Sequence, residues 1–578
     1  MNAGRRAGFV AAAAVALQAA LSVDAMRGNS ATFDEGAHLP AGYSHLALGD
    51  HRLNPEQPPL VKLVAALPLE ALSPELRTDD VAWRTARQWE FGRRFLYRWN
   101  DADRLLFLGR LPVVALAACL VAAVFAVGRR FSPAAAAAAA GLAALSPDVL
   151  AHGTLVTTDL GFALFFFLSV VSFDRLLERV TPGRLIGAGL ATGAAFATKF
   201  SAPILLPVFV VLGAIGLARR AGGHAEGGVK HRKAMLVVSF ALVLLVALGV
   251  VWASYGFRPA LSPDPAIRAE LAKPLEPPHD GALRSLVAFA GRSRIVPEDY
   301  ARGMLFVTEH SAARPTFLLG ELREGPFPYY FAVTFLLKTP LPLLLLVALA
   351  ALRIPRLERR EALLVWIPVA VYAAATATRG LQIGHRHLLP IYPFLFLAAG
   401  EAAVALAAWR APLGRVAVFL LAAWYAGGTL VQHPQHLGYF NELAGGTKNG
   451  WRLLVDSNLD WGQDLKRLAA WLREHPTPGL KLSYFGSADP AYYGIESEAL
   501  PGYTSPHAPR ITREIRPGDV LAVSATNLQG VYLEPADRAL MARVRELEPI
   551  ARVGASIFVF RSDFEWPAAA SAAPAEPR

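Results

Sequence analysis

The chain has 578 residues, of which 54% are hydrophobic and only 18% are charged, and its formal net charge is +11. A soluble protein of this size could not cover so much apolar surface, whereas a lipid bilayer can, so the composition excludes an ordinary soluble enzyme. The basic residues lie in short clusters between apolar runs, which indicates membrane orientation and argues against a nucleic-acid surface.

Eleven apolar runs predict membrane-spanning helices. They lie at about 9–24, 105–128, 133–150, 160–176, 184–200, 203–218, 234–256, 329–352, 362–378, 388–408 and 416–431. The single cysteine, Cys119, falls inside the second run, which excludes a disulfide framework and a cysteine-rich metal site. The first run could instead be a cleaved signal peptide. No clear small-x-small cleavage motif precedes Asp34, which favours an uncleaved first span.

The basic clusters predict the orientation of these spans. They are Arg5 and Arg6, Arg129 and Arg130, Arg175 to Arg184, Arg219 to Lys233, Arg353 to Arg360, and Arg410 to Arg415. With eleven spans all six fall on one face, which is cytoplasmic by the positive-inside rule. The other face then carries two long loops at 25–104 and 257–328, two short loops near 151–158 and 379–387, and everything after about residue 432.

The segment 432–565 predicts a small soluble α/β domain on that outer face, separate from a transmembrane domain at 1–431. "GLKLSYFG" (479–486), "DVLAVSA" (519–525) and "ASIFVFR" (555–561) are β-branched and aromatic runs bounded by Gly and Pro, which is typical of strands. "DLKRLAAWLREH" (464–475) has the apolar spacing of a helix. The Pro/Ala-rich end at 566–578 predicts a disordered tail.

The first outer loop carries an acidic pair in "ATFDEGAH", Asp34 and Glu35, about ten residues after the first span. Paired acids beside lipid are costly unless they are solvated or used. A helix start is an equally good interpretation, with Asp34 at the N-cap and Glu35 in the first turn. Further on, "NPEQPPLVKLVAALP" (54–68) predicts an amphipathic helix that lies along the membrane interface.

A third acid, Asp159, stands at the outer mouth of a span, shortly after His152. Thr158 and Asp159 before an apolar run are also an ordinary helix start. Basic residues occur on the same side. Lys199 lies between two runs, and Lys338 lies within a run that Pro340 and Pro342 are expected to break. An intramembrane lysine indicates function, with snorkelling to the interface as the alternative.

"GHRHLLPIYPF" places His385, Arg386 and His387 at an outer helix end. The two histidines could bind a metal, but no third ligand is evident nearby, so an anionic phosphate suits Arg386 and its neighbours better. After the last span, a dense polar patch contains Asp456, Asn458, Asp460, Trp461, Gln463 and Asp464. Its spacing lacks the Gly and terminal Glu of a calcium loop. Turn and cap chemistry explains Asp460 and Asp464, whereas contact with an acceptor or glycan, with Trp461 stacked on a sugar, is the alternative.

Together these motifs resemble the lipid-carrier-dependent glycosyltransferases of the GT-C fold, which include protein O-mannosyltransferases and the aminoarabinose transferases of lipid A. The resemblance runs through the acidic pair, "NPEQPPLVKL", "TTD", "FLLGELREGPFPYYFAVTFLLKTPLPLLLL", "IGHRHLLPIYPF" and "YFNELAGGTKNGWRLLVDSNLDWGQDL". It implies an all-α polytopic membrane protein with about eleven transmembrane helices and a small C-terminal α/β extracytoplasmic domain. It also implies a bacterial inner membrane location. The chain departs from the best-known eukaryotic members from "DSNLDWGQDL" onward.

The resemblance implies a polyprenyl-phosphate-linked sugar donor and a protein, lipid or polysaccharide acceptor, with no nucleic acid. Asp34 would be the general base of an inverting transfer, with Glu35 and Asp159 orienting hydroxyls and stabilising charge on the sugar ring. The leaving phosphate would be stabilised by Lys199, Lys338, His385, Arg386 and His387. The sequence requires no cofactor and assigns no metal. A polytopic flippase or transporter of lipid-linked sugars is the alternative function, although such proteins more often show paired half-repeats and midplane sites.

Overall fold

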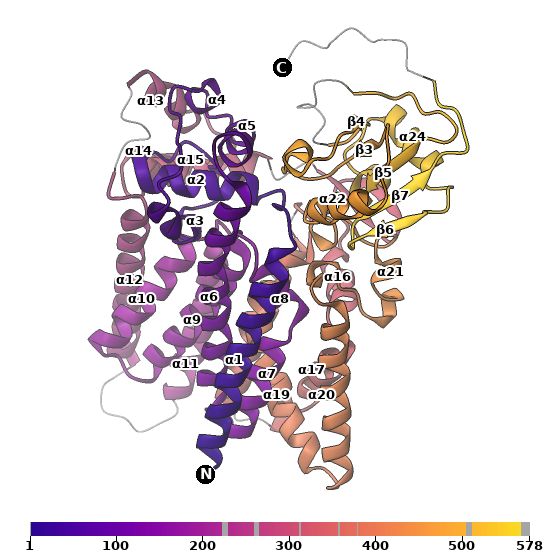
Figure 1. Cartoon of the computed structure of the whole chain (residues 1–578). Coiled ribbons are helices and arrows are strands. Elements are labelled where there is room, and N and C mark those ends of the chain that lie inside the picture. The colour runs from indigo at the N-terminus through magenta and orange to yellow at the C-terminus, as the bar shows by residue number, and fades with distance from the viewer. Residues whose placement is uncertain are drawn as a thin grey trace.

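The computed structural model describes residues 2–221, 229–258, 265–310, 314–356, 359–378, 380–503 and 511–567. Long helices form a bundle, and shorter helices together with a small sheet gather at one end of it (Figure 1). The N-terminus lies at the opposite end (Figure 1). Of the predicted disordered tail, residues 568–578 lie outside the described part of the chain.

Every predicted span corresponds to a helix or a pair of helices. Seven described stretches are long and apolar enough to cross a membrane. They are α1 (Ala3–Arg27), α6 (Ala102–Gly128), α9 (Thr158–Glu178), the apolar part of α12 (Val229–Ser254), α18 (Arg359–Ala377), η6 (His385–Ile391) with α19 (Tyr392–Ala408), and α20 (Leu413–Gln432). Shorter helices fill the remaining runs, namely α7 (Pro133–Ala144), α10 (Pro182–Phe196) and α11 (Leu205–Ala221).

Proline breaks two of the predicted spans. The run at 329–352 forms α16 (Tyr330–Lys338) and α17 (Leu341–Leu352), which are bent by 117° around Pro340 and could together make an eighth span. This is the break that the sequence predicts. The run at 133–150 is also divided, because α7 ends at Ala144 and α8 (Pro147–His152) begins at a proline. A single span was predicted there.

Three of the basic clusters meet at one end of the bundle. Arg130 and Arg360 both pair with Asp174 at the end of α9, each at 2.7 Å, and Arg184 pairs with Glu178 at 3.1 Å. These contacts join the clusters at 129–130, 175–184 and 353–360, as expected if the basic clusters lie on one face of the membrane. The cluster at 219–233 contains residues 222–228, which lie outside the described residues.

The other end of the bundle carries the helices of the long loops (Figure 1). The first loop forms α2 (Glu35–Leu48), α3 (Leu60–Ala66), α4 (Val81–Arg84) and α5 (Gln88–Arg94), and the second forms α13 (Pro265–Ala272), α14 (Ala282–Arg292) and α15 (Glu298–His310). Helix α3 packs between α2 and α6 with four of its seven residues buried. Helix α3 was predicted to lie along the membrane interface, but it packs against protein on more of its surface than such a helix would.

The C-terminal region contains a five-stranded sheet at the same end as these loop helices (Figure 1). The strand order is β4 (Glu498–Ala499), β3 (Lys481–Ser483), β5 (Val520–Ser524), β7 (Ile557–Arg561) and β6 (Ala551–Val553). Strand β3 is parallel to β4 and β5, whereas β7 is antiparallel to β5 and β6. All three predicted strands are present, and the predicted helix is α22 (Leu465–Glu474). The predicted fold class is confirmed, whereas the domain boundary at residue 431 stays a prediction.

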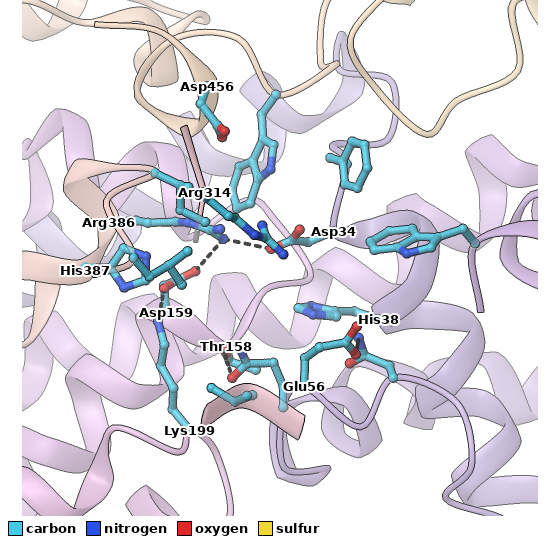
Figure 2. Close-up of a pocket in the computed structure, with 18 of the residues that line it drawn as sticks. Asp34, His38, Glu56, Thr158, Asp159, Lys199, Arg314, Arg386, His387 and Asp456 are labelled. Carbon is cyan, nitrogen blue, oxygen red and sulfur yellow. Dashed lines mark hydrogen bonds and ion pairs between the residues drawn. The ribbon is translucent and has the colours of Figure 1, made fainter. Parts of the chain in front are cut away.

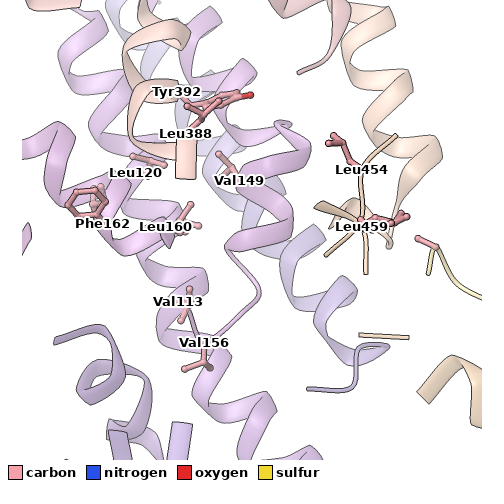
Figure 3. Close-up of a cluster of buried hydrophobic side chains, with 14 of the residues drawn as sticks. Val113, Leu120, Val149, Val156, Leu160, Phe162, Leu388, Tyr392, Leu454 and Leu459 are labelled. Atoms are coloured by element: carbon pink, nitrogen blue, oxygen red, sulfur yellow. The ribbon is translucent and has the colours of Figure 1, made fainter. Parts of the chain in front are cut away.

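A continuous apolar core holds the helices in place. The polar side chains lie on these helices at the end of the bundle that also carries the sheet. Members of the core include Val113 and Leu120 of α6, Val149 of α8, Leu160 and Phe162 of α9, Leu388 of η6 and Leu454 near the sheet (Figure 3). Because α9 and η6 are both anchored in this core, the residues at their outer ends are held in fixed relative positions.

Candidate active site

A cavity of about 210 Å³ lies where the loop at 25–104, span ends such as the start of α9, and the C-terminal region meet. Its charged lining residues are Asp34, Glu56, Asp159, Lys199, Arg314, Arg386 and Asp456, with His38 and His387 beside them (Figure 2). The cavity thus contains both carboxylates and cations.

Asp34 occupies the N-cap position of α2 but makes no capping hydrogen bond with its side chain. Its carboxylate instead accepts a hydrogen bond from Arg386 Nη1 at 2.8 Å, and the side chain keeps 24% of its surface exposed. The helix-start interpretation is therefore right for the backbone position, while the carboxylate itself is turned to the cavity. That leaves Asp34 accessible to a small molecule.

Arg386 connects the first outer loop, α9 and the C-terminal region (Figure 2). The same Nη1 that binds Asp34 lies 3.4 Å from Asp159 Oδ2. The guanidinium carbon also lies 4.1 Å from the centre of the Trp461 ring, within the range of a cation–π interaction. Two carboxylates that the sequence separates by more than a hundred residues are thus held close together by one cation.

Lys199 makes an ion pair with the second of these carboxylates. It follows α10 and donates to Asp159 Oδ1. Asp159 lies in the first turn of α9 and is 2% exposed, so burial would disfavour its charge without the two cations. His387 lies beside Arg386 in the lining (Figure 2). Of the sequence-predicted site residues, the structure brings together Asp34, Asp159, Lys199, Arg386, His387 and Trp461.

Hydrogen bonds attach the C-terminal region directly to the loop that carries Asp34. Phe33 N donates to Trp461 O at 2.7 Å, and Ser30 N donates to Gln463 O at 3.1 Å. A Cβ atom on Gly36 would lie 2.3 Å from Ser487 Oγ, so only glycine allows the first turn of α2 to approach this closely. The C-terminal region therefore helps to fix the position of Asp34.

Glu35, which was predicted to orient hydroxyls, lies outside the cavity lining. It is fully buried, and its two oxygens accept hydrogen bonds from Arg110 Nε and Nη2 at 2.8 and 2.7 Å. It also accepts from Thr32 and from Val156 N. Burial alone would raise the pKa of Glu35, but Arg110 and these hydrogen bonds hold it below its usual value. These contacts favour a role for Glu35 in holding the segment that carries Asp34, and its predicted role in orienting hydroxyls stays a prediction.

Lys338 and His385 are also outside the cavity lining. Lys338 Nζ donates to Leu437 O and Asn458 O, at 2.9 and 2.6 Å, and so joins the broken span to the C-terminal region. It is 4% exposed, which rules out snorkelling to the interface. His385 Nε2 lies 2.6 Å from the Tyr392 hydroxyl and 3.6 Å from Asp148. Both residues bind protein groups and neither lines the cavity, so their predicted contact with a phosphate stays a prediction.

Asp460 lies outside the cavity as well, in agreement with the cap interpretation. Its Oδ2 accepts from Thr526 N at 2.8 Å, while no hydrogen-bond partner for Oδ1 occurs among the described residues. Asp464 similarly accepts from Ala555 N and Ser556 N. These two carboxylates hold the chain after the last span against the sheet.

Asp460 should make stability depend on pH. Burial raises its pKa to about 8, so the folded protein holds a proton that the unfolded chain releases above about pH 4. Its contribution to stability is therefore complete below pH 4 and is lost as the pH rises through 8. We expect the thermal unfolding midpoint in detergent to fall over this range, and Asp460→Asn to reduce that fall. An identical pH dependence in both proteins would contradict the assignment.

Several lining residues were not predicted from the sequence. His38 lies one turn after Asp34, and its Nδ1 lies 3.0 Å from Val156 O. Burial lowers the pKa of His38, which favours the neutral imidazole. The spacing of Asp34 and His38, four residues apart at a helix start, was a signal that could have identified it. Arg314 was obscured by the many arginines of its loop, and Asp456 belongs to the polar patch from which Asp460 and Trp461 were chosen.

Within the described residues, no three His, Cys, Asp or Glu side chains lie close enough to hold a metal ion. His385 and His387 point to different surroundings, the first toward Asp148 and the second toward the cavity. The expectation that no cofactor is required stays a prediction.

Residues 104–252 match the family model of dolichyl-phosphate-mannose-protein mannosyltransferases. The predicted resemblance is confirmed. The matched segment runs from α6 into α12 and contains Asp159 and Lys199, and it supports the predicted enzyme class, a glycosyltransferase. No curated protein matches the sequence significantly.

Among solved structures, ArnT from Cupriavidus metallidurans in the apo state is similar over 96% of this chain and 97% of its own, with 14% identity and a TM-score of 0.48. The same protein bound to undecaprenyl phosphate gives 15% identity, coverage of 96% and 98%, and a TM-score of 0.42. The Archaeoglobus fulgidus oligosaccharyltransferase in complex with Zn and sulfate gives 12%, coverage of 92% and 70%, and a TM-score of 0.41. Similarities this distant transfer neither ligands nor residue roles to this chain.

Proposed function

We propose that this multi-pass membrane protein transfers a sugar from a polyprenyl-phosphate carrier to an acceptor hydroxyl, with inversion at the anomeric carbon. The observation that carries the proposal is the cavity in which Arg386 holds Asp34 and Asp159 together. The cavity contains Asp159 at the start of α9, whereas the paired basic loops contact Asp174 near the other end of that helix. By the positive-inside rule the end that carries Asp159 is extracytoplasmic, where a lipid-linked sugar is the natural donor.

Asp34 acts as the general base. The acceptor oxygen attacks the anomeric carbon, the bond from that carbon to the phosphate oxygen breaks, and the hydroxyl proton passes to the Asp34 carboxylate. Its partial exposure allows this contact, whereas Asp159 is buried between Lys199 and Arg386. Asp159 therefore orients the two cations and stabilises positive charge on the sugar ring in the transition state.

The leaving polyprenyl phosphate gains negative charge as its bond to the sugar breaks. Lys199, Arg386 and His387 line the cavity around Asp159 and stabilise this charge. Arg314 is exposed and also lines the cavity, where it adds a fourth donor. Because phosphate is a good leaving group, the reaction needs no general acid. The acceptor oxygen displaces the phosphate in a single step, and this direct displacement inverts the anomeric configuration.

The transfer is tested with the purified full-length protein in lipid nanodiscs. Synthetic polyprenyl-phosphate mannose and polyprenyl-phosphate aminoarabinose serve as donors, with envelope fractions as acceptors. We expect release of free polyprenyl phosphate in equal amount to sugar bound to the acceptor, with the anomeric configuration inverted by NMR. Retention of configuration would exclude the single displacement. Movement of the intact lipid-linked sugar between leaflets, without release of polyprenyl phosphate, would establish the flippase alternative.

A further inference from the structure

One wall of the cavity consists of aromatic rings from two distant parts of the chain. Phe33 and Trp89 come from the first outer loop, and Phe485, Tyr503 and Tyr532 come from the C-terminal region. We call these five residues the aromatic wall. Phe33 lies 4.7 Å from Trp89 and 5.6 Å from Phe485, and Tyr532 lies 4.8 Å from Tyr503, between ring centres. The rings thus form one continuous surface.

Four of the five rings that line the cavity keep exposed surface. Phe485 is 3% exposed and backs the wall, whereas Tyr503 is 41% exposed and Phe33, Trp89 and Tyr532 are half-buried. A group of aromatic faces open to an aqueous cavity is unfavourable unless something covers them, so such a group indicates a binding site. Aromatic faces combine a large apolar area with little conformational entropy to lose on binding.

Asp456, whose backbone is in the left-handed region, borders the aromatic wall. Asp456 has a φ of 57°, in the left-handed region that non-glycine residues seldom adopt. Its side chain accepts hydrogen bonds from the Tyr532 hydroxyl and from Ser457 N, and its N–H donates to Thr526 Oγ1 at 3.0 Å. In Figure 2, Arg386 lies between Asp456 on one side and Asp159 with Lys199 on the other.

The cavity therefore has two chemically different sides. The side toward the spans holds the cations Lys199 and Arg386, which suit a phosphate. The other side holds the aromatic wall and Asp456, which suit a neutral group with both an apolar face and hydroxyl donors. Asp34 stands between them, because Arg386 contacts it from one side and Phe33 precedes it in the chain.

We propose that the aromatic wall and Asp456 form the acceptor subsite, and that the acceptor is a carbohydrate. The proposal rests on the proposed glycosyl transfer. The C–H face of a sugar ring stacks on the wall, one hydroxyl donates to Asp456, and another reaches Asp34 and is glycosylated. An extended peptide would seek a strand edge, and none of the described lining residues belongs to the edge strands β4 or β6.

Binding is measured first, without donor, by saturation-transfer NMR on the full-length protein in nanodiscs with a panel of methyl pyranosides. We expect wild type to bind at least one glycoside, and Tyr503→Ala and Asp456→Asn to weaken that binding by about fivefold or more. The matched control is Tyr492→Ala, because Tyr492 is 37% exposed in the same C-terminal region but does not line the cavity. Absence of glycoside binding to wild type, or equal weakening by the control, would overturn the proposal.

Turnover is then measured with polyprenyl-phosphate mannose or aminoarabinose as donor and either the bound glycoside or a serine- and threonine-containing peptide as acceptor. We expect the glycoside to be glycosylated, with its KM raised about fivefold or more by Tyr503→Ala and Asp456→Asn while the KM of the donor changes little. Transfer to the peptide alone would overturn the carbohydrate assignment. Glycoside binding without any release of polyprenyl phosphate would contradict the transferase function and leave the subsite established.

Discussion

Asp34→Asn is expected to abolish sugar transfer, with kcat lowered by about 10²- to 10⁴-fold, the usual contribution of a positioned general base. Asparagine has nearly the same shape, and its amide oxygen can still accept from Arg386, so the change removes basicity with little effect on packing. Donor binding should persist, because the cations that face the phosphate remain. The measurement is single-turnover release of polyprenyl phosphate, alongside equilibrium binding of the donor.

The matched control for this substitution is Asp79→Asn, since Asp79 is an exposed aspartate of the same outer loop that does not line the cavity. Its kcat should stay within a factor of two of the wild-type value. If Asp34→Asn transferred sugar at a rate within tenfold of wild type, another group would have to take the proton. His38 would then be the next candidate, since its neutral imidazole also lines the cavity.

The spans and the sheet could be predicted because each has a local cause. In lipid, every backbone polar group must find a partner within the chain, so a long apolar run has to become a helix. The break at Pro340 follows from the missing N–H of proline. The strands at 479–486, 519–525 and 555–561 follow from side chains that suit a half-buried pleated surface.

The sequence alone does not show which of the adjacent acids Asp34 and Glu35 faces the cavity. Successive residues at a helix start point about 100° apart, so of Asp34 and Glu35 only one can face a given cavity. Which one does so depends on Arg110, far along the chain in α6, which binds Glu35. The partner of Asp34 is Arg386, 352 residues away. Sequence patterns place both groups at the outer end of the bundle but do not pair them.

For the same reason, the sequence does not show which aspartate of the C-terminal polar patch lines the cavity. Asp456 and Asp460 are four residues apart, and both are ordinary turn residues by composition. The positive φ of Asp456 turns it to the cavity, whereas Asp460 binds Thr526 in the adjoining segment. Lys338 was predicted as a phosphate ligand because an intramembrane lysine usually indicates function, and His385 because it neighbours Arg386. Here the carbonyl groups of Leu437 and Asn458 and the hydroxyl of Tyr392 bind them instead.

Arg110→Met is expected to cause the largest loss of stability, about 3–5 kcal/mol in the free energy of unfolding. Arg110 is 1% exposed and donates to both oxygens of Glu35 and to the carbonyls of Met26, Asn29 and Ser30. Removing it leaves a carboxylate buried without its counter-charge. Thermal unfolding in detergent measures the loss, with Arg104→Met as the control because Arg104 is exposed on the same helix.

Glu35→Gln distinguishes support from catalysis. Glutamine keeps the shape and the acceptor oxygen but loses the charge that Arg110 requires, so the unfolding midpoint should fall. The kcat of the protein that remains folded should stay within a few fold of wild type, because Glu35 does not line the cavity. Replacing both members together, Glu35→Leu with Arg110→Met, should recover part of the stability lost by Arg110→Met alone, since no buried charge is then left unpaired. An unchanged midpoint for Glu35→Gln with a hundredfold loss of kcat would instead return Glu35 to the catalytic machinery.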